Sequence, residues 1–325
     1  MKETIKKALK YIVSVSLAAI LMWFSFREVE WNDFAEELRN CRWQYILVSM
    51  IAGAFAFWIR GLRWRQLLLP IDSSISRVAT FNGINIGNIS NFVFPRIGEF
   101  VRCGVIVRRS SATYDKVLGT VVLERGWELL VMLLMLALVV AGGFERFGDF
   151  FISQVWEPMS SRVDISLWWL VAIVAVSGGI GVYLLWKYRA YNAFCVKIWN
   201  IFSGLIQGFS SCLRMQRKWL FFASTALIWL TYWFMAASTM WAAPFLDDLN
   251  LIDALFLSLV GGLGFAVPVP GGIGAFHFII SLALMGVYGV PMETGIVYAT
   301  LSHTSQAVTQ IIFGLGSYAY ETIRK

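Results

Sequence analysis

The chain has 325 residues, of which 58% are hydrophobic and 14% are charged. That much apolar surface exceeds what a water-soluble core of this size buries, so the composition excludes an ordinary soluble protein and indicates an integral membrane protein. The net charge of +7 would suit a nucleic-acid-binding protein, but the basic residues are gathered in particular loops, and we expect no nucleic-acid partner. Contact of these loops with anionic lipid headgroups explains the charge.

Apolar segments of about 20 residues, the length that crosses a bilayer, predict six full membrane spans. The spans are expected at residues 8–26, 43–60, 117–142, 166–186, 219–243 and 293–319. Bulky side chains follow the first span where a cleavage site would need small ones, so we expect an uncleaved signal anchor. Loop 187–218 is basic, whereas loops 26–42 and 244–253 are rich in acids, and the positive-inside rule therefore places both termini in the cytoplasm.

The apolar region 78–108 begins and ends among basic residues and is interrupted midway by Pro95 and Gly98. Because proline removes a backbone donor and glycine permits chain reversal, we expect a re-entrant helical hairpin that opens to the cytoplasm. Backbone groups freed at such a break are tolerated only beside protein or water, which places the break at a protein-lined cavity. Two short tilted spans, broken at the same depth, are the alternative.

Charged and amide side chains surround this first break. Arg96 beside the proline could hold a phosphate together with helix-end amides, and Glu99 and Arg102 could face each other on one helix side. The alternative is that both arginines snorkel to the headgroups, which leaves the acid between them unexplained. A polar stripe on the first half of the hairpin suits a hydrated or headgroup-lined groove, or else hydrogen bonds between helices. It consists of Asn82, Asn85, Asn88 and Asn91.

Span 117–142 carries Glu124, Arg125 and Glu128 in its first half. The two glutamates are one turn apart, a spacing at which like charges repel unless a cation lies between them, and Arg96, Arg102 or Arg125 could supply that cation. Charged residues at membrane depth are candidates for ligand contact. A structural network of buried ion pairs is the alternative.

The region 252–290 is broken by a second group of prolines and glycines and is expected to form a hairpin that opens to the outside. The group consists of Pro268, Pro270, Gly271, Gly272 and Gly274. His277 follows this break and His303 lies in the last span; they are the two histidines of the chain, and we expect them to gate transport or relay protons. Each could instead be hydrogen-bonded between helices. With no third ligand nearby, we expect no metal site, and no cofactor.

The order span, span, hairpin, span occurs twice, with opposite orientation. Together with a faint match between the two breaks, this order predicts an inverted repeat within one transmembrane domain, 1–325, with halves at about 1–142 and 166–325. The expected fold is therefore an all-α polytopic membrane protein with six full spans and two broken re-entrant hairpins, about eight membrane segments in all.

Four stretches carry a resemblance to a known family: GLRWRQLL, FPRIGEFVR, LERGWE and PVPGGIGAFH. Together they resemble the flippase-like transmembrane region of lysylphosphatidylglycerol synthases and its stand-alone relatives. The resemblance covers essentially the whole chain, and its PRxGE and PxPGGxG elements are the more specific ones. It implies movement of an aminoacylated phospholipid between leaflets in two-domain members, and a link to polyisoprenyl-lipid glycan assembly in archaeal relatives.

The chain departs from the family pattern at both histidines. The family usually has glutamate at the position of His277 and commonly arginine at that of His303, so a Glu–Arg pair is replaced here by a His–His pair; Glu128 stands for the family's aspartate. The longest loop, 187–218, is too short for a soluble synthase domain, so we expect no aminoacyl transfer.

Three functions remain open. We expect a non-enzymatic transporter or flippase that moves a lipid with an anionic or phosphorylated headgroup through a groove between the two hairpins. A membrane-embedded glycosyl- or phosphotransferase acting on a lipid carrier is the alternative, with a glutamate as general base. A small-solute transporter is the third. The expected partners are membrane lipids and a separate lipid-modifying enzyme, and the expected location is a bacterial or archaeal cytoplasmic membrane.

Overall fold

The computed structural model describes residues 2–27, 29–143 and 215–324, together with scattered positions between 147 and 199. The expected span 166–186 and loop 187–218 lie, apart from a few positions, outside the described residues. The described part of the chain is helical and contains no strand. Its elements are α1 (Lys2–Phe26), α2 (Trp31–Asn40), α3 (Trp43–Leu68), α4 (Arg77–Val93), α5 (Gly98–Val107), α6 (Tyr114–Gly142), α11 (Lys218–Ala242), η3 (Pro244–Leu246), α12 (Leu251–Ala266), η4 (Pro270–Gly272), α13 (Ala275–Tyr288) and α14 (Met292–Ile323).

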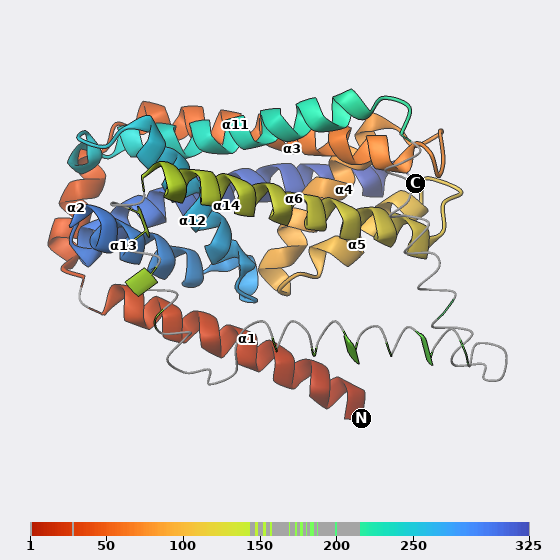
Figure 1. Cartoon of the computed structure of the whole chain (residues 1–325), viewed down its shortest axis with the longest axis horizontal. Coiled ribbons are helices and arrows are strands. Elements are labelled where there is room, and N and C mark those ends of the chain that lie inside the picture. The colour runs from red at the N-terminus through yellow and green to blue at the C-terminus, as the bar shows by residue number, and fades with distance from the viewer. Residues whose placement is uncertain are drawn as a thin grey trace.

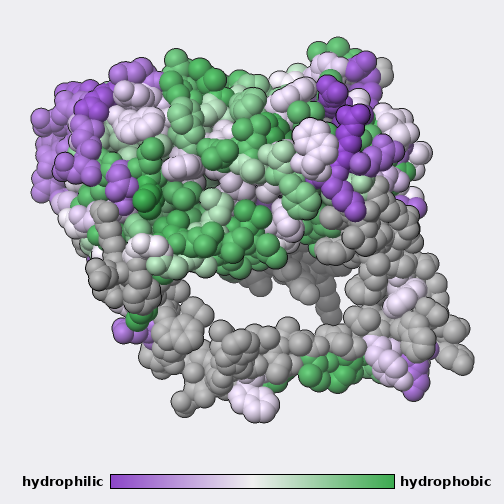
Figure 2. Space-filling model, turned by 45° about the horizontal axis from the view of Figure 1, so that its top comes forward, coloured by the Kyte–Doolittle hydropathy of each residue, from purple (hydrophilic) through white to green (hydrophobic). Residues whose placement is uncertain are grey.

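Four helical stretches among the described residues are long and apolar enough to cross a membrane. They are Trp43–Leu68, Tyr114–Gly142, Lys218–Ala242 and Pro270–Tyr288. The first three coincide with predicted spans, and the fourth is the second half of a predicted hairpin. Figure 2 shows a broad hydrophobic surface between two hydrophilic ends, the surface expected where lipid tails surround a protein. The chain is therefore an integral membrane protein, while six spans with two re-entrant hairpins stays a prediction.

α4 and α5 form the first broken hairpin, packed side by side at two glycines. A Cβ added at Gly98 would lie 2.1 Å from the carbonyl oxygen of Gly87, so glycine is needed for this close approach. The chain reverses between the helices, where the Asn91 side chain accepts a hydrogen bond of 2.8 Å from the Gly98 amide. Arg96 lies in this turn with φ of 59°, a backbone conformation that non-glycine residues rarely adopt.

α12 and α13 form the second broken hairpin, with η4 in the break. Gly271, Gly272 and Gly274 all have positive φ, between 59° and 81°, which glycine adopts without strain. A Cβ at Gly274 would lie 2.7 Å from the Ala18 carbonyl oxygen of α1, so α1 passes directly over this break.

The two hairpins enter the bundle from opposite ends and meet at their breaks (Figure 1). The Arg96 guanidinium donates a hydrogen bond to the Ala266 carbonyl at the end of α12. A Cβ at Gly271 would lie 2.5 Å from the ring of Phe92 in α4, so the breaks are in direct contact. The order α3, broken hairpin, α6 is followed by α11, broken hairpin, α14, which is the order that an inverted repeat requires.

Ion pairs mark the two ends of the bundle. At the first, Arg109 at the end of α5 pairs with Glu321 of α14 at 2.9 Å, and we call this the Arg109 end. At the other, Arg42 before α3 binds Asp247 after α11 with both oxygens of the carboxylate, and we call this the Arg42 end. This bidentate hydrogen bond lowers the pKa of Asp247 below its usual value.

Asp72, in the loop between α3 and α4, connects two loops at the Arg109 end. Its carboxylate accepts hydrogen bonds from the hydroxyl and amide of Ser74 and, in the α5–α6 loop, from those of Ser111. These four donors, with the Ser74 hydroxyl the largest contributor, hold the pKa of Asp72 well below its usual range.

Candidate functional site

A group of charged side chains lies between α3, α5 and α6. Arg63 of α3 donates to Glu124 at 2.8 Å and also to Glu128, so a single guanidinium bridges the two carboxylates of α6. Arg63 and Glu124 are completely buried. The glutamates share one face of α6 because they are four residues apart, and the cation between them removes the repulsion that this spacing would otherwise cause.

Two further arginines complete this group. Arg102 of α5 lies 2.7 Å from Glu124, and Arg125 lies 2.9 Å from Glu128. The Arg102 guanidinium also sits 4.7 Å above the ring of Trp64, whose indole donates to Thr120 at 3.0 Å. We call Arg63, Arg102, Glu124, Arg125 and Glu128 the ion cluster.

Two charged residues next to the ion cluster have no ionic partner of their own. Arg60, one turn before Arg63 on α3, forms no ion pair with the described residues, and its buried Nε has no hydrogen-bond acceptor. Glu99 of α5 likewise has a buried carboxylate oxygen without a donor. Arg60 is within electrostatic reach of Glu99, Glu124 and Glu128.

These two residues and the ion cluster together contain one more cation than anions. Four guanidinium groups face three carboxylates, and Arg60 is the cation left without a direct counter-ion. Arg60 is half-buried with a buried Nε, and withdrawing an uncompensated charge from water is costly unless something neutralises it. The arrangement can therefore accept an anionic group beside Arg60.

The sequence-predicted charged residues around the first hairpin do not all lie together. Arg102, Glu124, Arg125 and Glu128 meet in the ion cluster, whereas Arg96 is exposed at the hairpin tip and outside it. Arg102 pairs with Glu124 rather than with Glu99, as no ion pair joins Glu99 to Arg102 in the described part of the chain.

Two guanidinium groups lie between the glutamates of α6. Arg125, one of the predicted cations, lies 3.8 Å from Glu124 and 2.9 Å from Glu128. Arg63, which was not among the predicted residues, also contacts both carboxylates. Arg60 could have been found from the sequence, because it is a charged residue at the end of the predicted span 43–60, and charges at membrane depth mark functional positions. Arg63 lies three residues beyond the predicted span and one turn along the same helix.

The asparagine stripe of α4 makes different contacts along its length. Asn82 donates to Glu321 at 2.7 Å near the Arg109 end, and Asn91 holds the turn through the Gly98 amide. Between them, Asn85 is completely buried, and neither of its amide atoms is hydrogen-bonded to a described residue; the buried amide nitrogen of Asn88 also has no partner among those residues. The middle of the stripe therefore has unused hydrogen-bonding capacity.

The two histidines lie together behind the second break. Their ring centroids are 4.9 Å apart, and Nε2 of His303 lies 2.9 Å from the Gly271 carbonyl oxygen. Because a carbonyl only accepts, this Nε2 carries a proton, and α14 is thereby tied to the second break. Nδ1 of His277 is buried and has no hydrogen-bond partner in the part of the chain that the structure describes. No group of three metal-ligating side chains occurs among the residues the structure describes.

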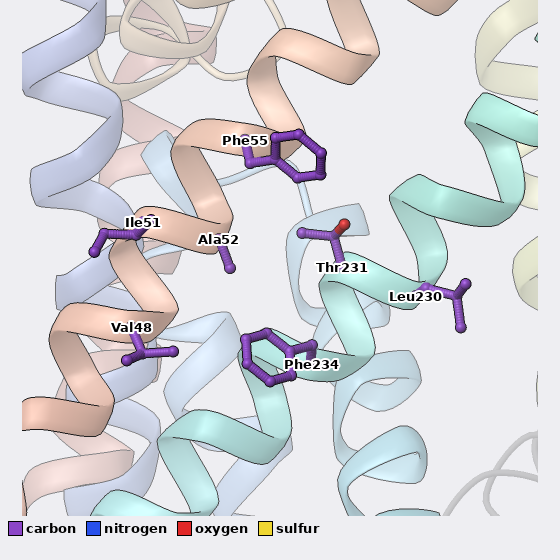
Figure 3. A pocket seen from close by; sticks show the side chains of 7 residues that line it. All are labelled: Val48, Ile51, Ala52, Phe55, Leu230, Thr231 and Phe234. Atoms are coloured by element: carbon purple, nitrogen blue, oxygen red, sulfur yellow. The ribbon is translucent and has the colours of Figure 1, made fainter.

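An apolar groove also lies between α3 and α11, away from these charges. It has a volume of about 510 Å³ and is lined by Val48, Ile51, Ala52, Phe55, Leu230, Thr231 and Phe234 (Figure 3). Its one hydroxyl, on Thr231, already donates to the Leu227 carbonyl at 2.7 Å, so the groove offers a ligand little beyond apolar contact. We call it the α3–α11 groove.

Comparison with known proteins identifies a family. One curated relative is the glycosyltransferase AglD of Haloferax volcanii. It is 23% identical to this chain over 304 residues, which cover 83% of this chain and 48% of the relative. The chain thus spans about half the length of that protein. No solved structure matches it. The lysylphosphatidylglycerol synthase TM region matches residues 11–314, nearly the whole chain, and the protein therefore belongs to that family.

Proposed function

We propose that this protein moves a lipid with an anionic or phosphorylated headgroup between the two leaflets of a membrane. The observation that carries the proposal is the surplus cation, Arg60, beside a buried ion cluster and two broken hairpins that touch at their tips. A headgroup needs a polar path through the hydrocarbon region, whereas the tails can stay in lipid. Broken helices meeting near the middle of a membrane protein are the usual location of such a path.

The proposed path uses polar groups that the protein leaves unpaired. An incoming phosphate would neutralise Arg60, and the free amide groups of Asn85 and Asn88 would replace part of its hydration. Glu124 and Glu128 then act as positioning residues, because they hold the neighbouring guanidinium groups in fixed directions. Both termini are proposed to face the cytoplasm, which puts the Arg109 end on that side.

At the second break, we assign a gating role to the histidines. His303 fixes the carbonyl of Gly271, and Gly271 contacts Phe92 of the first hairpin. An opening between the hairpin tips must break either the contact of Gly271 with Phe92 or the hydrogen bond from Arg96 to the Ala266 carbonyl. The two contacts are the proposed gate.

A liposome assay tests the transport proposal. Purified protein is reconstituted with fluorescent phosphatidylglycerol and, separately, a fluorescent polyprenyl phosphate, and dithionite quenching measures the lipid that reaches the outer leaflet. Arg60→Gln is expected to slow transport at least tenfold, whereas Arg108→Gln, an exposed arginine at the end of α5, is expected to leave the rate unchanged. Arg96→Ala should also change the rate, because it removes a gate contact.

Equal transport by wild type and Arg60→Gln would remove the proposed headgroup site. Absence of transport by the wild-type protein with either lipid would refute the function itself. Loss of transport in Arg108→Gln as well would show that the assay reports general electrostatics at the surface rather than a site.

Transfer of a glycosyl or phosphoryl group to a lipid carrier is the second candidate function, and the name of the AglD relative favours it. Glu124 and Glu128 are both held by guanidinium groups, so Glu99, with its unpaired carboxylate oxygen, is the residue best able to act as general base. Turnover of a lipid-linked substrate by purified protein that is lost in Glu99→Gln would establish this function in place of transport.

A further inference from the structure

A second groove lies between α6 and α11, and aromatic residues separate one end of it from the ion cluster. It has a volume of about 440 Å³. It is lined by Trp127, Val131 and Met135 of α6 and by Phe222, Thr225, Ala226, Trp229, Leu230 and Trp233 of α11. We call it the α6–α11 groove. α6 packs against α3, α5 and α12, whereas α11 packs against α3, α12 and α14. The groove therefore lies between two long helices that pack mainly against other helices.

One end of the α6–α11 groove adjoins the charged residues. Trp127 lies between Arg125 and Glu128 in sequence, and its ring packs on Phe222 and Phe221 at centroid distances of 5.5 and 6.1 Å. The Arg63 guanidinium sits 5.9 Å above Phe221. A molecule in the groove therefore contacts the aromatic residues that separate it from the ion cluster.

The dimensions of the groove suit one leaflet of a bilayer. On α11 its lining runs from Phe222 to Trp233, a rise of about 16 Å at 1.5 Å per residue. The hydrocarbon core of a bilayer is about 30 Å thick, so the groove is about as long as one leaflet is deep.

Two polar groups distinguish this groove from an ordinary lipid-facing surface. The indole N–H groups of Trp127 and Trp229 are buried, and neither has a hydrogen-bond acceptor in the described residues. The third tryptophan of the groove, Trp233, does have one, because it donates to the Leu251 carbonyl at 2.6 Å. Unpaired buried donors cost free energy unless a ligand supplies an acceptor oxygen.

We propose that the α6–α11 groove is the lateral site where the hydrocarbon chain of an anionic phospholipid binds, with its headgroup at the ion cluster. This rests on the proposed function and adds the place where the lipid enters. Apolar walls take the acyl chain, the two indole donors bind oxygens of its ester region, and the surplus positive charge at Arg60 selects an anionic headgroup.

Photo-crosslinking in nanodiscs of phosphatidylcholine tests the assignment. Two probes carry the same diazirine-labelled acyl chain, one on phosphatidylglycerol and one on phosphatidylcholine, and labelled peptides are mapped by mass spectrometry. Phosphatidylglycerol is expected to label the α6–α11 groove at least fivefold more than phosphatidylcholine does. Leu230 lines both grooves, so the control is the α3 wall of the α3–α11 groove, from Val48 to Phe55, which both probes should label equally.

Variants of two alanines on α11 provide the matched comparison. Ala226 lines the groove and Ala223, three residues away, does not, although both are exposed. Ala226→Trp should fill the groove, reduce its labelling by phosphatidylglycerol several-fold and slow transport, whereas Ala223→Trp should change neither. Trp127→Phe keeps the ring but removes one donor, and should reduce the preference for phosphatidylglycerol even if Ala226→Trp fails to fold.

The outcomes separate this inference from the proposed function. Equal labelling of the groove by the two probes, or labelling that Ala226→Trp leaves unchanged, overturns the lipid site even if transport occurs. Preferential labelling by phosphatidylglycerol in a protein that transports nothing establishes the site and refutes transport.

Discussion

Neutralising Glu124 is expected to destabilise the protein strongly. Its side chain is fully buried, accepts a hydrogen bond from Arg63 at 2.8 Å and lies 2.7 Å from Arg102. Among the described residues, Glu124 is the one ionic partner of Arg102. Glu124→Gln therefore leaves the guanidinium of Arg102 buried without a counter-ion. Breaking a buried ion pair from one side costs about 3–5 kcal/mol, which is about two to three and a half powers of ten in the unfolding equilibrium constant.

Removing both charges should cost less than the two single changes suggest. The double variant Glu124→Gln/Arg102→Gln leaves neither member of this pair charged. We therefore expect its loss of unfolding free energy to be about 2 kcal/mol smaller than the sum of the losses in the two single variants. Glu321→Gln is the matched control, because its partner Arg109 is one-third exposed. An exposed pair of this kind is worth at most about 1 kcal/mol.

Equilibrium unfolding in detergent micelles, followed by circular dichroism, is measured for five proteins: wild type, Glu124→Gln, Arg102→Gln, the double variant and Glu321→Gln. If Glu124→Gln costs no more than Glu321→Gln, or if the two changes at Glu124 and Arg102 are additive, the buried-charge reasoning is wrong. A water-filled site, in which solvent already screens these charges, would give that result.

Three further predictions concern the hairpins and the loop at the Arg109 end. Gly98→Ala should lower the melting temperature or prevent folding, because the added Cβ would lie 2.1 Å from a backbone oxygen. Gly104→Ala on the same helix is the control. Its added Cβ would have nothing within 4 Å, so it should be neutral or slightly stabilising in the same thermal melt. His303→Phe should lose about 1–3 kcal/mol in chemical unfolding because the Gly271 carbonyl loses its donor; no loss would show that the bond is dispensable. Asp72 has a lowered pKa, so the stability it contributes is present above its unfolded value of about 4 and is lost as pH falls below it. The Asp72→Asn variant should have a lower melting temperature than wild type at neutral pH, and it should lack the part of the acid-induced loss of stability that comes from Asp72.

Much of the candidate site was accessible from the sequence because charge inside an apolar span is informative by itself. Arg102, Glu124, Arg125 and Glu128 were all selected for that reason, and they do meet. Arg60 meets the same criterion, because it is the last residue of the predicted span 43–60. Arg63 lies three residues beyond that span, and it belongs to the apolar helix because α3 continues to Leu68.

The partners of those residues could not be predicted in the same way. Arg96 and Arg102 lie on the same short hairpin, yet the first reaches across to α12 and the second turns to α6. Which of them neutralises Glu124 depends on how α5 is rotated and how far it is inserted between α3 and α6. That rotation is set by the glycine contact between α4 and α5 and by the stacking of Arg102 on Trp64.

The sequence by itself determined the class of the protein, the main apolar helices and the two breaks, because hydropathy and the conformational limits of proline and glycine are local properties. Only the tertiary structure decided that the breaks touch, that Arg63 bridges the two glutamates, that Arg60 has no ionic partner among the described residues and that His277 and His303 lie together. These are contacts between helices far apart in the chain, and they depend on helix rotation and depth, which side-chain packing sets and local sequence patterns do not encode.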